Sequence, residues 1–218
     1  MALGTAVIIG VGPGLGLEIA RAFANAGHPV AMLARDKAKL DAFAAELAPA
    51  GPQIRGYSTD AADPGNLRSS IRAAITDLGA PDVLVYNIGV LRKDSSVGGD
   101  DQYWADATAV NILGARVAAN AVLPELRDGR GSLLFTGGGW ATHPLKEFAS
   151  LSVGKAGLRA YAKVLHEQLA GTPVHVTTVT VTAALGEGDP RFEPAVLAQT
   201  YLALHNQPES EWQDELVY

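Results

Sequence analysis

Near its amino terminus the sequence reads Thr5-Ala-Val-Ile-Ile-Gly-Val-Gly-Pro-Gly-Leu-Gly16, an apolar run that passes directly into a glycine-rich turn. The β-branched residues of the run favour a buried strand. After the turn, Leu15, Ile19 and Phe23 recur near a helical period, and Gly27 stands where a left-handed cap would end that helix. Strand, turn and helix in this order predict a site where a phosphate approaches bare backbone at a helix N-terminus. The alternative is a turn that uses glycine for conformation alone.

A second unit indicates which nucleotide would bind. Residues 30–34 predict another buried strand, and Arg35 and Asp36 follow it before an amphipathic helix that carries Leu40 and Leu47. At the end of such a strand an acidic residue would bind ribose hydroxyls, whereas an arginine grips a 2′-phosphate. Arg35 therefore favours NADP(H) over NAD(H). The alternative is an exposed arginine beside Asp36, with Asp36 acting as the helix N-cap.

Strands and helices continue to alternate to the end of the chain. Further strands are predicted at 53–58, 83–85, 133–136, 174–181 and 216–218, and further helices near 64–78, 101–127, 150–170 and 194–205. This alternation predicts an α/β fold, a Rossmann-type three-layer sandwich with a doubly wound parallel sheet, as a single domain over residues 1–218.

Taken together, these motifs resemble those of the short-chain dehydrogenase/reductase family along nearly the whole chain. Gly10, Gly14 and Gly16 match its Gly-x-x-x-Gly-x-Gly motif, and Asn111 and Lys155 match two members of its catalytic tetrad. The resemblance implies an NADP(H)-dependent oxidoreductase in which Asn111 and Lys155 are catalytic. It implies cofactor binding by Gly10, Gly12, Gly14, Leu15, Gly16, Arg35, Asp60, Asn87, Gly89 and Lys155.

Two catalytic positions depart from the family pattern. By the family spacing, the tetrad tyrosine is replaced by Leu151 and the serine by Gly138; the Pro-Gly pair after the sixth strand is also missing, at residues 181–182. A positioned acid contributes about 10²–10⁴-fold, and one oxyanion donor about 10²–10³-fold. A fast carbonyl reductase of the usual mechanism is therefore not expected.

Other groups near the missing tyrosine are weak substitutes. Ser150 and Ser152 flank Leu151, but each is rotated by about 100° on a helix. His143, in the loop with Trp140, is typical of a surface turn.

Two further side chains have open roles. Tyr86 is predicted to shape the pocket wall. Lys155 keeps the role of binding the nicotinamide ribose; the alternative is a packed stem whose amine reaches water.

Composition excludes several classes of function. The 218 residues are 48% hydrophobic, and 17 basic against 23 acidic residues give a net charge of −6 without a basic run, so no nucleic-acid partner is expected. No signal peptide or membrane span is predicted. The chain has no cysteine, and its five histidines lack metal-ligand spacing. We expect a cytoplasmic protein with a small-molecule substrate and no metal.

Three functions stay open. The favoured one is an NADP(H)-dependent oxidoreductase that acts on a carbonyl or an imine with an unusual proton source. The others are a catalytically inactive nucleotide-binding homologue, acting as a sensor or subunit partner, and a protein of the same fold with a different ligand.

Two features predict the pocket and the assembly. Segment 183–193, shorter than the family's substrate lid, predicts an open pocket. The apolar faces of helix 150–170 predict a homodimer or homotetramer.

Overall fold

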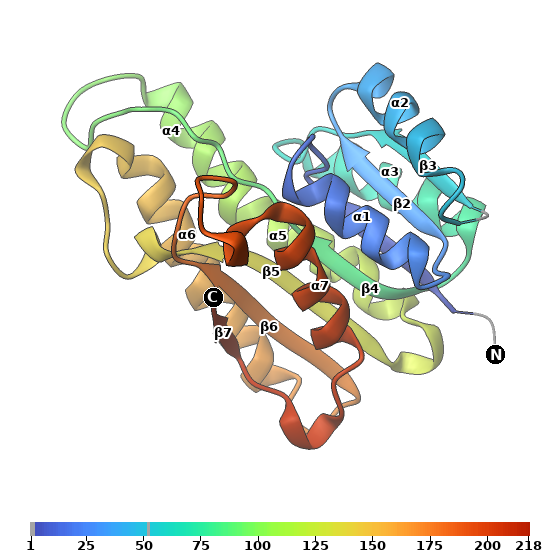
Figure 1. The fold of residues 1–218 in the computed structure, drawn as a ribbon. Helices are drawn as coiled ribbons and strands as arrows, with labels where there is room; N and C mark the ends of the chain where they lie inside the picture. Colours follow the sequence, from blue (N-terminus) through green and yellow to red (C-terminus); the bar gives the residue numbers. More distant parts are fainter. Residues whose placement is uncertain (1–2, 52) are drawn as a thin grey trace.

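The sheet carries every strand of the protein that the computed structural model describes, which comprises residues 3–51 and 53–218. The strands are β1 (Thr5–Ile9), β2 (Val30–Ala34), β3 (Ile54–Ser58), β4 (Pro81–Tyr86), β5 (Gly131–Gly138), β6 (Val174–Val181) and β7 (Glu215–Val217). All of their pairings are parallel, in the order β3-β2-β1-β4-β5-β6-β7. The chain winds outward from β1 in one direction and from β4 in the other (Figure 1).

Helices cover both faces of this sheet (Figure 1). One face holds α1 (Leu15–Asn25), α2 (Lys37–Leu47) and α7 (Pro194–His205). The other holds α3 (Pro64–Leu78), α5 (Gly114–Val122) and α6 (Ala149–Gln168), while α4 (Asp101–Thr108) leads into α5. The predicted three-layer, doubly wound fold is confirmed.

The middle residues of the central strands are apolar on both sides because both faces of the sheet are covered. In β1, Val7 and Ile9 pack into the layer of α3 and α5, whereas Ala6 and Ile8 pack into the layer of α1 and α7. None of these four side chains is more than 1% exposed.

Local signals set the helix ends. Asp36 and Asp63 each accept backbone N–H bonds at the first turn of α2 and α3. Gly27, with φ at +94°, follows the last turn of α1 as the sequence predicts.

The predicted helix at 101–127 is not regular. A π-helical turn (Ala109–Leu113) separates α4 from α5, and short 3₁₀ turns follow α5. A π turn widens the helix and is common at functional sites. The hydroxyl of Tyr86 donates to the carbonyl of Val110 in this turn, at 2.5 Å. The interpretation of Tyr86 as a pocket wall is wrong, because this side chain is fully buried in the core.

The last strand closes the sheet edge. The predicted strand at 216–218 is confirmed with a shift of one residue, since β7 spans Glu215–Val217 and pairs with β6. Arg159 on α6 donates to both carboxylate oxygens of Glu215, with Nε at 2.7 and 2.9 Å. This ion pair fixes β7 against α6. In the part of the chain that the structure describes, no helix has the length and apolar character that a membrane span needs.

Candidate active site

The glycines of the turn after β1 divide into two kinds. Gly10 has φ at +92°, and a Cβ atom there would lie 2.3 Å from the carbonyl oxygen of Asn87. A Cβ atom on Gly16 would lie 2.5 Å from the carbonyl oxygen of Gly10. Gly12 and Gly14, in contrast, face open space. Gly10 and Gly16 are therefore required by packing, and Gly12 and Gly14 leave room for a ligand.

At the first turn of α1, the backbone N–H groups of Leu15 and Gly16 have no partner among the described residues. Its N-cap is Gly14, which makes no side-chain hydrogen bond to the helix. Leu15 begins the helix with its side chain buried, so it contributes to the turn only through its backbone. An uncapped helix N-terminus beside open space fits a pyrophosphate.

Three charged residues follow the ends of β2 and β3. Arg35 follows β2, is exposed, and takes part in no ion pair found among the described residues. Asp36 is the N-cap of α2, with the N–H of Lys39 3.1 Å from its Oδ1, so the predicted capping role is confirmed. Asp60 is also exposed, and its Oδ1 accepts the N–H of Ala62 at 2.9 Å.

Lys155 forms the centre of the site. Its amine donates to the carbonyl oxygens of Ile88 at 2.8 Å and Thr136 at 2.6 Å. The alternative in which the amine reaches water is wrong, because the residue is only 7% exposed. Burial disfavours the charged amine and lowers the pKa of Lys155 to about 8. Gly89 lies beside it, since a Cβ atom there would be 3.8 Å from Nζ.

Asn87 connects the amine region to the glycine turn. Its side-chain amide donates to the carbonyl oxygen of Gly10 at 3.1 Å. The structure therefore brings Gly10, Gly16, Asn87, Gly89 and Lys155 together. The carbonyls of Ile88 and Thr136, which fix the lysine, carried no sequence signal because any residue type supplies a carbonyl.

Asn111 is fully buried in the π turn, and one of its polar atoms lacks a partner. Its Nδ2 donates to the carbonyl of Ala107 at 2.8 Å, whereas Oδ1 has no hydrogen bond within the described residues. Gly154 packs directly against it: a Cβ atom on Gly154 would lie 2.7 Å from that of Asn111. A buried acceptor without a partner fits a bound ligand or an ordered water.

Gly138 and Leu151, at the positions predicted for the tetrad serine and tyrosine, carry no side-chain donor. Leu151 is 6% exposed on α6, and Gly138 at the end of β5 has room for a side chain, with Lys155 Cγ 3.8 Å from a Cβ atom placed there. Ser152 already donates to the carbonyl of Phe148 at 2.9 Å. The hydroxyl of Ser150 is buried without a partner in the described chain.

The loop after β5 contains His143 and Trp140, the other side chains considered as proton donors. His143 is exposed and lies 3.1 Å from the hydroxyl of its neighbour Thr142, as measured from Nδ1. Trp140 stacks on Phe148 with ring centroids 4.8 Å apart. These side chains shape the loop. The glycine turn, Asn87 and Lys155 are joined by hydrogen bonds, whereas no such network of donors is found around Gly138 and Leu151 in the described residues.

Comparison with known proteins gives consistent matches. The family model described as short chain dehydrogenase matches residues 4–187. D-threitol dehydrogenase of Mycolicibacterium smegmatis is 28% identical over 183 residues, which cover 84% of this chain and 70% of that protein.

Solved structures match over almost the whole length. A short-chain dehydrogenase from Rhodopseudomonas palustris has 27% identity and a TM-score of 0.88, covering 99% of this chain and 97% of the other. A metagenomic short-chain oxidoreductase in complex with NADP has 24% identity and a TM-score of 0.89, covering 100% and 98%. The latter is a likeness of fold.

The two kinds of glycine should respond differently to alanine. We expect Gly10→Ala to lower the free energy of unfolding by about 2–4 kcal/mol, because it combines a left-handed φ with a clash against Asn87. Gly12→Ala is the matched control and should change it by less than about 0.5 kcal/mol. Urea unfolding measures both. Equal losses in the two variants would contradict the division.

Lys155 should make stability depend on pH. The unfolded chain holds its proton up to the ordinary lysine pKa of 10.5, whereas the folded protein releases it near 8. Between these values the unfolded state binds more protons, so the free energy of unfolding should rise with pH by up to roughly 3 kcal/mol. Lys155→Met should lack this rise when both proteins are unfolded by urea between pH 7.5 and 10.5. Parallel curves for the two proteins would refute the buried, shifted amine.

Proposed function

Because the chain belongs to the short-chain dehydrogenase family, we propose that it is an NADP(H)-dependent oxidoreductase that transfers hydride to or from a small carbonyl or imine substrate. The observation that carries the proposal is the buried amine of Lys155, which two carbonyls hold beside Gly89. One of these carbonyls belongs to Ile88, and the preceding residue, Asn87, is hydrogen-bonded to Gly10 of the glycine turn. Burial of a lysine amine costs free energy, and a hydrogen bond to a ribose hydroxyl would give the buried amine a function that explains this cost.

Each end of the cofactor has candidate residues. Backbone N–H groups near Gly12 and Gly14 would hold the pyrophosphate, Arg35 the 2′-phosphate, and Asp60 the adenine. The ammonium of Lys155 has three N–H bonds; two are used by Ile88 and Thr136, which leaves one for the nicotinamide ribose. The cofactor, when bound, supplies the hydride. A solved protein of the same fold holds NADP, which agrees with this choice.

The proton-donating half of the site is atypical. Neither Gly138 nor Leu151 can donate a proton from its side chain, so a carbonyl substrate would take its proton from water or from another group. A protonated imine carries its own proton and accepts hydride without an acid. The site therefore supports imine reduction better than carbonyl reduction.

Assembly and location are also proposals. On the outer side of α6, Val153 and Val164 are 53% and 55% exposed and lie three helical turns apart on one face. This apolar face supports a homodimer or homotetramer. The cytoplasmic location stays a prediction from the sequence.

NADPH and NADH titration of the purified protein tests the cofactor proposal. We expect micromolar NADPH binding that Arg35→Ala weakens roughly tenfold or more, with little effect on NADH, because a charge-assisted bond to the 2′-phosphate is lost. Lys39→Ala removes an exposed cation of α2, the helix that follows Arg35, and is the control; it should leave both affinities unchanged.

Two results decide between the functions. If neither nucleotide binds, the oxidoreductase proposal fails and only the fold is left. If NADPH binds but no imine or carbonyl is turned over, the protein is the catalytically inactive homologue.

Sedimentation of the same preparation at micromolar concentration tests the assembly. It should give a dimer or tetramer, and a monomer would contradict the proposed assembly.

Restoring the missing donors should restore carbonyl chemistry. The variant Gly138→Ser/Leu151→Tyr places hydroxyl groups at both positions, and Gly138 has the room for a side chain. We expect kcat/KM for carbonyl reduction to rise about 10²–10⁴-fold over Gly138→Ser/Leu151→Phe, which has the same ring without the hydroxyl. Equal rates for the two variants would show that a lost proton donor does not limit the reaction.

A further inference from the structure

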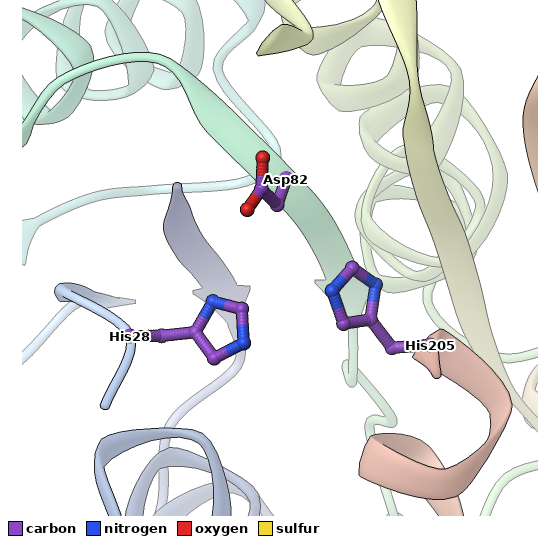
Figure 2. A group of neighbouring side chains, drawn as sticks. All are labelled: His28, Asp82 and His205. Carbon is purple, nitrogen blue, oxygen red and sulfur yellow. The ribbon is translucent and has the colours of Figure 1, made fainter. Parts of the chain in front are cut away.

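Three ligand-type side chains meet at the opposite end of the sheet from the glycine turn. His28 lies in the turn between α1 and β2, Asp82 is the second residue of β4, and His205 is the last residue of α7. One nitrogen or oxygen atom from each lies within 4.8 Å of the other two. Figure 2 shows the two imidazole rings and the carboxylate turned toward one common space. Residues 54 and more positions apart in the sequence are thus brought to one point.

A hydrogen bond to a carbonyl fixes which nitrogen of His28 is free, and a hydrogen bond to a hydroxyl allows the same arrangement in His205. Nδ1 of His28 lies 2.8 Å from the carbonyl oxygen of Gly4, and a carbonyl only accepts, so Nδ1 carries the proton and Nε2 has the lone pair. Nδ1 of His205 lies 3.0 Å from the hydroxyl oxygen of Ser132. Donation from this Nδ1 likewise leaves Nε2 with a lone pair. Metal-binding histidines are held in this way, with the second ring nitrogen donating to a backbone or side-chain oxygen.

The carboxylate is held in place as well. Nε and Nη2 of Arg127 each lie 2.9 Å from one oxygen of Asp82, and the N–H of Gly4 also donates to this carboxylate. Gly4 packs so closely that a Cβ atom there would lie 2.3 Å from Oδ1. A carboxylate has about four lone-pair sites, so the three donors found among the described residues leave one for a cation.

When Nδ1 of His205 donates to Ser132, the three side chains present only acceptors to the common space. No hydrogen bond joins His28, Asp82 and His205 to one another among those found in the described chain. Two imidazole lone pairs and a carboxylate oxygen repel one another unless a cation or a hydrogen-bond donor lies between them.

The surroundings separate this group from solvent on one side only. His28 is 2% and Asp82 7% exposed, and the ring of Phe23 packs against both imidazoles with centroids 5.3 and 5.8 Å away. On the other side, His205 and Asp82 line a cavity of about 440 Å³. An ion and one water ligand can enter from this cavity.

We propose that His28, Asp82 and His205 bind one zinc-type divalent cation, with a water from the cavity as the fourth ligand. Two imidazoles and one carboxylate are a ligand set that zinc accepts in tetrahedral geometry. Bonds of about 2.0–2.1 Å would bring the ligand atoms to roughly 3.3 Å from one another, so the group closes around the ion by up to about 1.5 Å. His205, at the free end of α7, is the side chain placed to make that movement.

The cation would have a structural role. It would join the carboxyl end of α7 to β4 and to the turn before β2. These three segments are far apart in the sequence. A ligand that binds only the folded state stabilises it in proportion to the logarithm of its concentration. The site lies away from the proposed nucleotide site, and its existence does not depend on the proposed function.

Zinc binding to the metal-free protein tests the proposal. Equilibrium dialysis with zinc chloride should give one bound ion per chain, and zinc at a hundred times its dissociation constant should raise the melting temperature by roughly 5–10 °C. His205→Gln, at a half-buried position, should lose the ion and the shift. His143→Ala removes an exposed histidine elsewhere and should keep both.

Two outcomes would overturn the site. One is a wild-type protein that binds no zinc, in which case a water or a proton bridges the three side chains. The other is equal zinc binding by wild type and His205→Gln, which would place the ion on surface groups. Should His205→Gln fold poorly, as judged by far-ultraviolet circular dichroism, His28→Gln provides the same comparison from a different element.

Discussion

The close approach of Gly10 to Asn87 is the constraint on which the rest of the structure depends. At this point β1 ends between β2 and β4, and the chain leaves the sheet toward α1. Only a residue without Cβ fits, because the carbonyl oxygen of Asn87 would lie 2.3 Å from it, and the Asn87 amide fastens the turn by donating to Gly10. This contact sets where α1 begins. It also sets the distance between the open glycines and the buried amine of Lys155.

The two halves of the candidate site are built from different parts of the chain. The nucleotide half consists mainly of backbone groups: the N–H groups of the first turn of α1 and the carbonyls of Ile88 and Thr136 that hold Lys155. Those groups persist as long as the fold persists. The proton-donating half needs particular side chains. Two substitutions can therefore remove its donors without disturbing the sheet. Gly138 and Leu151 stand where the sequence predicts the serine and the tyrosine, and a Cβ atom on Gly138 would meet no heavy atom closer than 3.8 Å.

Helix α7 connects the two ends of the sheet. The hydroxyl of Tyr201 lies 2.7 Å from that of Thr136, whose carbonyl holds Lys155, so the middle of α7 supports the amine from behind β5. Its last residue, His205, reaches the group at the amino ends of the strands. A cation at that group would therefore stabilise a helix that also buttresses the candidate active site.

The sequence by itself determined the order of elements, the doubly wound sheet and the glycine turn, because each rests on a local pattern: alternating buried runs, caps such as Asp36 and Gly27, and glycines beside a strand end. It also located Lys155, and by spacing it predicted that Gly138 and Leu151 take the places of the tetrad serine and tyrosine. Only the tertiary structure decided that Tyr86 lies in the core, that Lys155 is held by two carbonyls, and that Asn111 keeps a buried acceptor without a partner among the described residues. It alone joined His28, Asp82 and His205. The physical reason is that backbone groups carry no residue signature, and that contacts between distant segments depend on strand order and register, which no local pattern contains.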